Sequence, residues 1–437
     1  MTLRPSRRDF IAGGVGAGLS LPLLGDLAPH WLSAANAGWD QKLVILQLNG
    51  GNDWINNLVN PDESVYQAAR PQLALPKAKM IQLNTTDPHY LHPRLAAFKT
   101  LYDQGRLALF PGYGYKVPNL SHFRSMDIMA EGDETARNVR AGWLGEVLSK
   151  VYTGAAQIEA LNIENRLNRH FIGHPVPVLQ PNSLSTFAFS TDSATRAVDG
   201  DVELALLESN AKVLRPTAIP NLRFLADAIG QAPSDSLILQ TAGGSYTPKA
   251  TYPSATTQDR YVRDRLQFVA RYIVGGLQTP IYMTSLGGWD THANEVDAAD
   301  NTLGNHADLL GAVADNVKAF LDDLKAWSKD SNVTVLVQSE FGRRVGENGN
   351  LGCDHGFAGI AYLAGATIKN AGVRTTFPDW SKVSTPYNRA HFQYTTMLDK
   401  VTPNHFLSMY ATLIEKLWGA DSTKVLGAQW PLHDVFG

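Results

Sequence analysis

Short apolar runs alternate with longer amphipathic stretches along most of this chain. Five apolar runs, each closed by glycine or polar residues, have the length and composition of strands buried on both faces. They cover residues 42–48, 107–110, 280–285, 333–338 and 360–363. Apolar residues spaced three and four apart predict helices over residues 93–104, 202–213, 258–273, 306–327 and 405–418. Buried strands that alternate with amphipathic helices predict an α/β fold, in which helices cover both faces of a mainly parallel sheet.

The first 37 residues do not follow this pattern. A charged start that contains Arg7 and Arg8 leads into an apolar, glycine-containing stretch, which is followed by the small residues of segment 35–37. This order is typical of a signal peptide, and the paired arginines indicate the twin-arginine type, whose passengers are exported already folded. A transmembrane anchor is the alternative, but the apolar stretch of about 14 residues is shorter than the about 20 needed to span a bilayer.

Residues 38–437 are therefore expected to form a single exported domain, in the periplasm or outside the cell. They contain no apolar stretch long enough to cross a membrane. The formal net charge of −3, with no basic run after the first segment, argues against nucleic acid as a partner. Cys353 is the only cysteine, so no internal disulfide can form.

Side chains that bind metal ions gather close to the ends of the predicted strands. In mainly parallel sheets, ligands bind beyond the C-terminal ends of the strands, so these side chains are expected to meet. The candidate metal ligands are Asp53, Asp290, His292, Glu340, Asp354 and His355. Carboxylate and imidazole groups suit one or two divalent ions such as Zn²⁺, Mn²⁺, Mg²⁺ or Ca²⁺. Two ions would stabilise the attacking and leaving oxygens of a phosphoryl or sulfuryl transfer.

Each of these residues also has a structural interpretation. Asp53 would cap the segment that follows it, and Glu340 would pair with Arg343 or Arg344. The pair Asp290 and His292 would form a turn with a hydrogen-bonded imidazole. The prediction of a metal site therefore depends on all of these segments meeting in space.

Segment 118–125 follows the strand predicted at 107–110 and opens a predicted helix. Because a helix N-terminus favours a bound anion, Ser121 is a candidate nucleophile and Arg124 a candidate anion-binding residue. Arg343 is the second candidate for binding the anion through two parallel hydrogen bonds. Ser125 or a metal-activated water is the alternative nucleophile, and a helix cap is the structural interpretation of Ser121.

Several motifs carry a resemblance to a known family. They include Leu48-Asn-Gly-Gly-Asn-Asp53, Ser121-His-Phe-Arg-Ser125, Gly287-Gly-Trp-Asp-Thr-His292, Ser339-Glu-Phe-Gly-Arg343 and Asp354-His-Gly356. At these motifs the chain resembles the bacterial "domain of unknown function 1501" family, which is typically exported with a twin-arginine signal. The family looks like a distant branch of the alkaline phosphatase and sulfatase superfamily, which implies a doubly covered sheet and a two-metal hydrolase site.

The resemblance implies a role for each matching residue. Asp53 would be the early metal carboxylate, Asp290 and His292 the middle pair, and His355 the late ligand. Three features depart from the superfamily pattern. Phe341 stands where a ligand histidine is usual, and the middle pair is spaced by two residues and not by four. Lys116 stands where the nucleophile is usual.

Two functions are compatible with these motifs. The first is an exported metal-dependent hydrolase that acts on a small anionic phosphate or sulfate ester. The second is a non-catalytic, sulfatase-like binding or assembly protein of the cell envelope, which the departures at Lys116 and Phe341 favour. Genes of the family often stand beside those of a second exported family, and this association suggests an exported protein partner.

Overall fold

The computed structural model describes residues 38–116, 119–135, 141–174, 241–244, 246–390 and 404–437, together with residues 209, 213, 235, 238 and 239. The predicted signal peptide and most of the helix predicted at 202–213 lie outside these residues. No helix in the described part of the chain has both the length and the apolar character that a membrane crossing requires.

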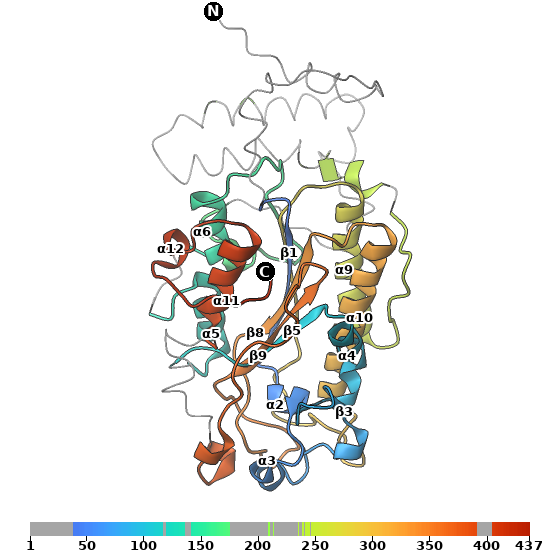
Figure 1. The fold of residues 1–437 in the computed structure, drawn as a ribbon, viewed down its shortest axis with the longest axis vertical. Helices are drawn as coiled ribbons and strands as arrows, with labels where there is room; N and C mark the ends of the chain where they lie inside the picture. The colour runs from blue at the N-terminus through green and yellow to red at the C-terminus, as the bar shows by residue number, and fades with distance from the viewer. Residues whose placement is uncertain are drawn as a thin grey trace, which may run out of the picture. The chain divides into compact units, whose positions relative to one another are not determined.

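The centre of the fold is a seven-stranded sheet with the strand order β10-β5-β9-β8-β1-β7-β6 (Figure 1). Its strands are β1 (Lys42–Leu48), β5 (Leu107–Tyr113), β6 (Ala160–Asn162), β7 (Ile281–Leu286), β8 (Val333–Ser339), β9 (Gly359–Gly365) and β10 (Gly372–Val373). β1 pairs in parallel with both β7 and β8, β6 with β7, and β10 with β5. β9 runs antiparallel to both of its neighbours, β5 and β8.

Helices cover both faces of this sheet, and the alternation of side chains along β1 shows how. Val44 and Leu46 belong to one buried cluster, and Leu43 and Ile45 belong to the other. The first cluster includes residues of α4 (Ala96–Asp103), α9 (Thr257–Val274) and α10 (Asn305–Ala326). The second includes residues of α5 (His122–Glu131), α6 (Trp143–Lys150) and α11 (Phe406–Thr412). These two helix groups lie on opposite sides of the sheet in Figure 1.

The remaining elements are short. A second sheet has the order β2-β4-β3, formed by β2 (Leu58–Val59), β3 (Ile81–Gln82) and β4 (Tyr90–Leu91). The short α-helices are α2 (Trp54–Asn57), α3 (Ser64–Ala69) and α12 (Thr423–Leu426). The 3₁₀ turns are η1 (Lys77–Lys79), η2 (Pro93–Leu95), η3 (Arg169–Phe171), η5 (Trp380–Lys382) and η6 (Tyr387–Arg389), and the π-helical turn η7 (Leu413–Leu417) continues α11.

The α/β class with a mainly parallel, doubly covered sheet is confirmed. All five predicted strands are present, and the helices predicted at 258–273 and 306–327 are α9 and α10. α9 begins at a capping box, in which Thr256 accepts a hydrogen bond from the Asp259 N–H and Asp259 accepts one from the Thr256 N–H. The single reversed strand, β9, is the main difference from a fully parallel sheet.

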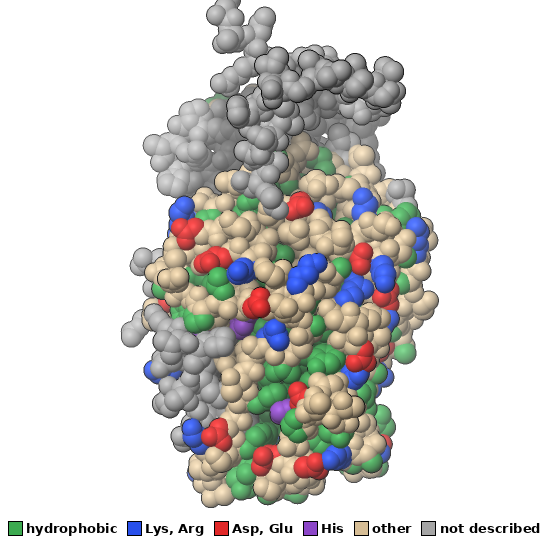
Figure 2. Space-filling view, viewed as in Figure 1, with side chains coloured by type: hydrophobic (Ala, Val, Ile, Leu, Met, Phe, Trp, Pro, Cys, Tyr) green, Lys and Arg blue, Asp and Glu red, His purple; other side chains and the backbone are tan. Residues whose placement is uncertain are grey.

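Charged side chains of both signs are interspersed over the described part of the face drawn in Figure 2. Among these residues the view shows no extended basic patch. This surface is in keeping with the small net charge of the chain, −3.

Candidate metal centre

Four side chains of types that can bind metal ions meet at the C-terminal edge of the central sheet. Asp290 and His292 follow β7, and His122 is the first residue of α5, which comes after β5. His355 lies in the connection between β8 and β9. Because β9 runs antiparallel to β8, this connection lies at the same edge as the C-terminal ends of the parallel strands.

The three histidines converge on one oxygen atom. The Nε2 atoms of His122, His292 and His355 lie 3.4, 3.0 and 3.1 Å from Oδ1 of Asp290. The Nε2 atoms of His292 and His355 are 2.8 Å apart. Suitable ligand atoms of His122, Asp290 and His355 all lie within 4.8 Å of one another. We call these four residues the histidine cluster.

The opposite nitrogen of each ring has its own acceptor. Nδ1 of His122 lies 2.8 Å from Oε1 of Glu340, and Nδ1 of His355 lies 2.7 Å from the carbonyl oxygen of Leu120. Nδ1 of His292 lies 3.2 Å from Oδ1 of Asp354. An outer acceptor on Nδ1 is the usual arrangement for metal-binding histidines, because it leaves the Nε2 lone pair facing the ion.

The pKa shifts of three residues describe the protonation of the cluster. Burial lowers the pKa of His355, and the nearby charge of Arg343 lowers it further. Partial burial would raise the pKa of Asp290, but the hydrogen bond and charge of Arg343 lower it to about 2. The hydrogen bond to Glu340 raises the pKa of His122. At neutral pH the cluster therefore contains an ionised carboxylate and a neutral His355 ring, which suit a cation, whereas an ion at His122 would compete with a proton.

Arg343 joins the segments that carry the cluster. Its guanidinium donates to the carbonyl oxygens of Gly51 at 2.6 Å and Cys353 at 2.9 Å, and to Oδ1 of Asp290 at 2.7 Å. Its side chain has no exposed surface. Arg343 was expected to bind a substrate anion, and its guanidinium is occupied by these buried contacts.

Asp53 lies apart from the histidine cluster. Its carboxylate forms a two-pronged ion pair with Arg70, at 2.5 and 2.9 Å, and neither side chain is exposed. It belongs instead to a second buried group, with Glu295 and Cys353. Burial, together with the charge of Asp53, raises the pKa of Glu295 well above its ordinary value. Asp53 was expected to share a metal site with Asp290, and its carboxylate is paired instead with Arg70.

Glu340 and Asp354, two of the expected metal ligands, contact the Nδ1 atoms of His122 and His292. Glu340 is buried and also accepts the N–H of Gly50 at 2.8 Å, while Asp354 accepts from Asn348 at 3.3 Å. The ring of Phe341 packs 4.8 Å from that of His122 and 4.9 Å from that of His355. Phe341 therefore offers no metal-binding atom but restricts the orientation of two rings of the histidine cluster.

One family matches most of the chain. The family described as "Protein of unknown function (DUF1501)" matches residues 111–425. The chain belongs to this family. The match confirms the family resemblance and covers the whole histidine cluster, although it begins after Asp53.

This DUF1501 protein was also compared with curated proteins and with solved structures. No curated protein matches its sequence. Ps i-CgsB, solved in complex with k-i-k-neocarrahexaose, is 12% identical, covers 90% of this chain and 74% of its own, and has a TM-score of 0.37. The lipoteichoic acid synthase LtaP from Listeria monocytogenes is 8% identical, covers 78% of this chain and 69% of its own, and has a TM-score of 0.35. The α/β class follows from the strands and helices described above.

The two serines considered as nucleophiles differ in environment. Ser125 is buried, and its hydroxyl bonds to Tyr115 and to the carbonyl oxygen of Asn119. Ser121 is exposed, and although it is the N-cap residue of α5, its side chain makes no capping hydrogen bond. Ser121 stands between Leu120, whose carbonyl binds His355, and His122. In this DUF1501 protein, therefore, only Ser121 of the two serines has an exposed side chain next to a residue of the cluster.

Arg124 and His122 belong to the same segment, but only His122 is part of the histidine cluster. The charge of Arg124 acts on Glu131 and Tyr115, neither of which belongs to the cluster. His122 was not among the expected ligands, although it lies in the matching segment of the DUF1501 resemblance. Its position between a predicted strand and a predicted helix is the signal that could have identified it.

Proposed function

We propose that this protein is an exported, metal-dependent hydrolase of phosphate or sulfate esters. The observation that carries the proposal is the convergence of three Nε2 atoms on Oδ1 of Asp290, each ring being held by an acceptor on Nδ1. Nε2 of His122 is buried and has no hydrogen-bond partner among the described residues, which an ion between the rings would satisfy.

The donor set indicates the kind of ion. Three imidazole nitrogens and one carboxylate oxygen suit Zn²⁺ best, and one ion is sufficient for this set. When bound, such an ion polarises the ester and lowers the pKa of water. Glu340 and Asp354 contact Nδ1 atoms and Asp53 is paired with Arg70, so among the expected carboxylates Asp290 alone contacts the Nε2 atoms, and we propose one ion and not two.

The residues of the chain supply positioning. Glu340, Asp354 and the Leu120 carbonyl fix the three rings, and Arg343 fixes Asp290 against them. Ser121, at the start of α5, is the proposed nucleophile, and the N-terminus of α5 favours the anionic ester beside it. If Ser121→Ala keeps the turnover number, water replaces the serine in this role.

Metal analysis tests the proposal directly. Protein purified without chelators is expected to contain about one ion per chain, and EDTA is expected to lower its melting temperature. Asp290→Asn should lose the ion and the turnover of p-nitrophenyl phosphate or sulfate, whereas Asp308→Asn, an exposed change on α10, should keep both. Metal content far below one ion per chain, with no response to EDTA, would contradict the proposal.

A non-catalytic binding or assembly protein of the envelope is the second candidate. The burial of Arg343 favours it, because no other described arginine contacts the carboxylate of Asp290. Bound metal without turnover of any ester tested would support this function. Cell fractionation of the full chain tests the proposed export separately.

A further inference from the structure

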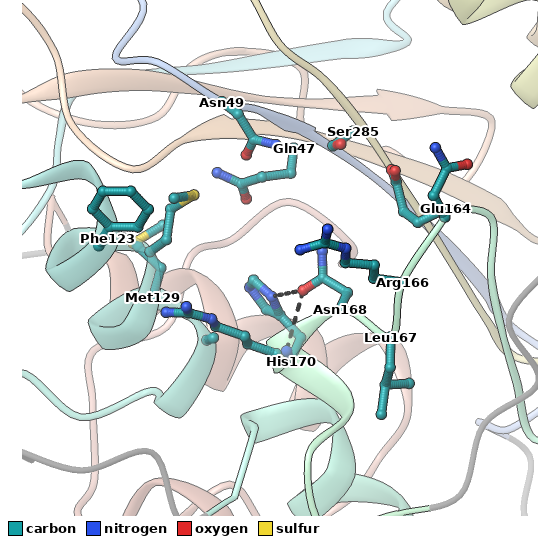
Figure 3. Close-up of a pocket in the computed structure, with 14 residues that line it drawn as sticks. Gln47, Asn49, Phe123, Met129, Glu164, Arg166, Leu167, Asn168, His170 and Ser285 are labelled. Carbon is teal, nitrogen blue, oxygen red and sulfur yellow. Dashed lines mark hydrogen bonds between the residues drawn. The ribbon is translucent and has the colours of Figure 1, made fainter.

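A cavity of about 350 Å³ lies on the α5 face of the sheet (Figure 3). The sheet contributes Gln47 of β1 and Ser285 of β7, which are paired in the ladder. Helix α5 contributes one wall, and segment 164–170, which follows β6, contributes another. Small-molecule pockets range from about 300 to 1,000 Å³, so the cavity has room for a small organic ligand.

The cavity adjoins the histidine cluster on two elements. Phe123, which lines it, directly follows His122 in α5. Asn49, which also lines it, directly precedes Gly50, whose N–H bonds to Glu340 behind the cluster. The cavity and the cluster are therefore built on two shared segments of the chain.

Two buried polar atoms at this cavity have no hydrogen-bond partner among the described residues. Gln47 uses Oε1 to accept from Gln338 at 3.2 Å, which leaves the two N–H groups of its Nε2 unpaired. His170 has Nδ1 2.7 Å from Oδ1 of Asn168, and its Nε2 is unpaired. Both side chains are more than nine-tenths buried. Figure 3 shows the ring of His170 and the amide of Gln47 on the cavity side.

The two unpaired atoms need opposite kinds of hydrogen-bond partner, one a donor and the other an acceptor. Burial lowers the pKa of His170 to about 3, so the ring is neutral at pH 7. Because Asn168 Oδ1 can only accept, Nδ1 of His170 carries the proton and Nε2 is an acceptor. Gln47 offers a donor at the same cavity. A ligand rich in hydroxyl groups satisfies both, since each hydroxyl donates and accepts.

The wall formed by α5 is apolar. Phe123 is 73% exposed, and Met126 and Met129 line the cavity beside it. Two of the charged groups at the cavity are engaged: Arg169 pairs with Asp127, and Glu164 accepts a hydrogen bond from Thr284, while the guanidinium of Arg166 also lines the cavity (Figure 3). Arg166 is exposed. A ring with C–H groups on its face and hydroxyls on its rim fits an apolar wall that stands opposite neutral polar groups.

We propose that this cavity binds a sugar ring, whose phosphate or sulfate ester group then reaches the histidine cluster. The inference rests on the proposed hydrolase function and names its substrate class, an ester of a carbohydrate. Gln47 and His170 would bind hydroxyls on the rim of the ring, and Phe123 would contact its face.

Binding of neutral monosaccharides to the full chain tests the inference without turnover. Saturation-transfer NMR with glucose, galactose and N-acetylglucosamine is expected to give saturable binding of at least one of them. Gln47→Met and Phe123→Ala should each weaken that binding about tenfold, the size expected for one lost contact. Phe123 is on the surface, so its variant should fold even if the buried Gln47→Met does not. Leu303→Ala, a change at another exposed apolar residue that does not line the cavity, should bind as the unmodified chain does.

The outcomes separate this inference from the proposed function. The absence of saturable binding by all three sugars, or unchanged binding in both cavity variants, would overturn the inference. Turnover of p-nitrophenyl esters alongside that negative result would leave the hydrolase proposal standing. Sugar binding that is lost in the variants, without turnover of any sugar phosphate or sulfate, would retain the cavity as a sugar site and contradict the hydrolase.

Discussion

Nδ1 of His122 lies 2.8 Å from Oε1 of Glu340, and this contact joins the start of α5 to the end of β8. The same oxygen accepts the N–H of Gly50, which follows β1. One buried carboxylate therefore holds together segments that follow three different strands. Because it raises the pKa of His122 and orients its ring, we assign Glu340 to positioning and not to metal binding.

Glu340→Gln is expected to weaken metal binding while leaving the chain folded. The amide keeps the shape of the side chain but is a poorer acceptor for His122, and loss of such an outer partner typically costs about 10–100-fold in affinity. Isothermal titration with Zn²⁺ measures this. Glu146→Gln, which removes a partner of the surface residue Lys150, is the matched control and should bind Zn²⁺ normally. Unchanged affinity in Glu340→Gln would contradict the positioning role.

Arg70→Met is expected to destabilise the fold by about 3–5 kcal/mol, because it leaves the charge of Asp53 buried without a partner. Arg70 also donates to the carbonyl oxygens of Val345 and Arg344, so the loss is not confined to one pair. Urea unfolding gives the free energy. The double variant with Asp53→Asn should be more stable than Arg70→Met alone, since neither charge remains. A double variant as unstable as the single one would show that the carbonyl contacts matter more than the charge.

Gly342→Ala is expected to be destabilising by about 1–3 kcal/mol and to disturb the cluster. A Cβ at this position would stand only 1.8 Å from the carbonyl oxygen of Ala358, so the backbone beside Arg343 must move. Gly349→Ala is the control in the same loop, where a Cβ would meet nothing within 4 Å. Thermal unfolding and Zn²⁺ titration of both variants measure the two effects. Equal stability of the two variants would be inconsistent with the close approach.

Acidification is expected to destabilise the protein partly through His433. Burial, together with the charge of Arg374, lowers the pKa of His433 from 6.5 to about 4. The unfolded chain therefore binds this proton more tightly, so the contribution to stability is complete above pH 6.5 and is lost as the pH falls towards 4. His433→Phe keeps a ring against Phe110 but cannot be protonated. Between pH 7 and 5 the unmodified chain should lose about 2 kcal/mol more than this variant, measured by urea unfolding. Parallel pH profiles for the two proteins would argue against a neutral buried His433.

The positions of the strands follow from the sequence more closely than their directions do. The predicted strand at 42–48 coincides with β1 because its ends are set by abrupt changes from apolar to polar residues. β5 continues beyond its predicted end at 110, through Pro111 and Gly112, because a register shift between Pro111 and Tyr113 accommodates them. The reversal of β9 was not predictable, since a run of buried apolar residues has no direction.

The site was predictable in part for similar reasons. Asp290, His292 and His355 stand beside glycines at strand ends, and the structure brings these three together. The pairing of Asp53 with Arg70 was hidden, because the two residues are 17 positions apart and no local pattern connects them. The sequence also does not show that Asp290 contacts Nε2 atoms whereas Glu340 and Asp354 contact Nδ1 atoms. This difference depends on which oxygen faces which ring.

Because Cys353 is buried, its reaction with a thiol reagent can report the opening of the loop that contains it. Its N–H donates to the carbonyl oxygen of Thr291, its carbonyl accepts from Arg343, and its thiol has no exposed surface. Since the chain has no other cysteine, the rate at which a thiol reagent labels it measures how often this loop detaches from the sheet edge, without background from elsewhere. Any ion or substrate that stabilises the closed arrangement should slow that labelling in proportion to its occupancy.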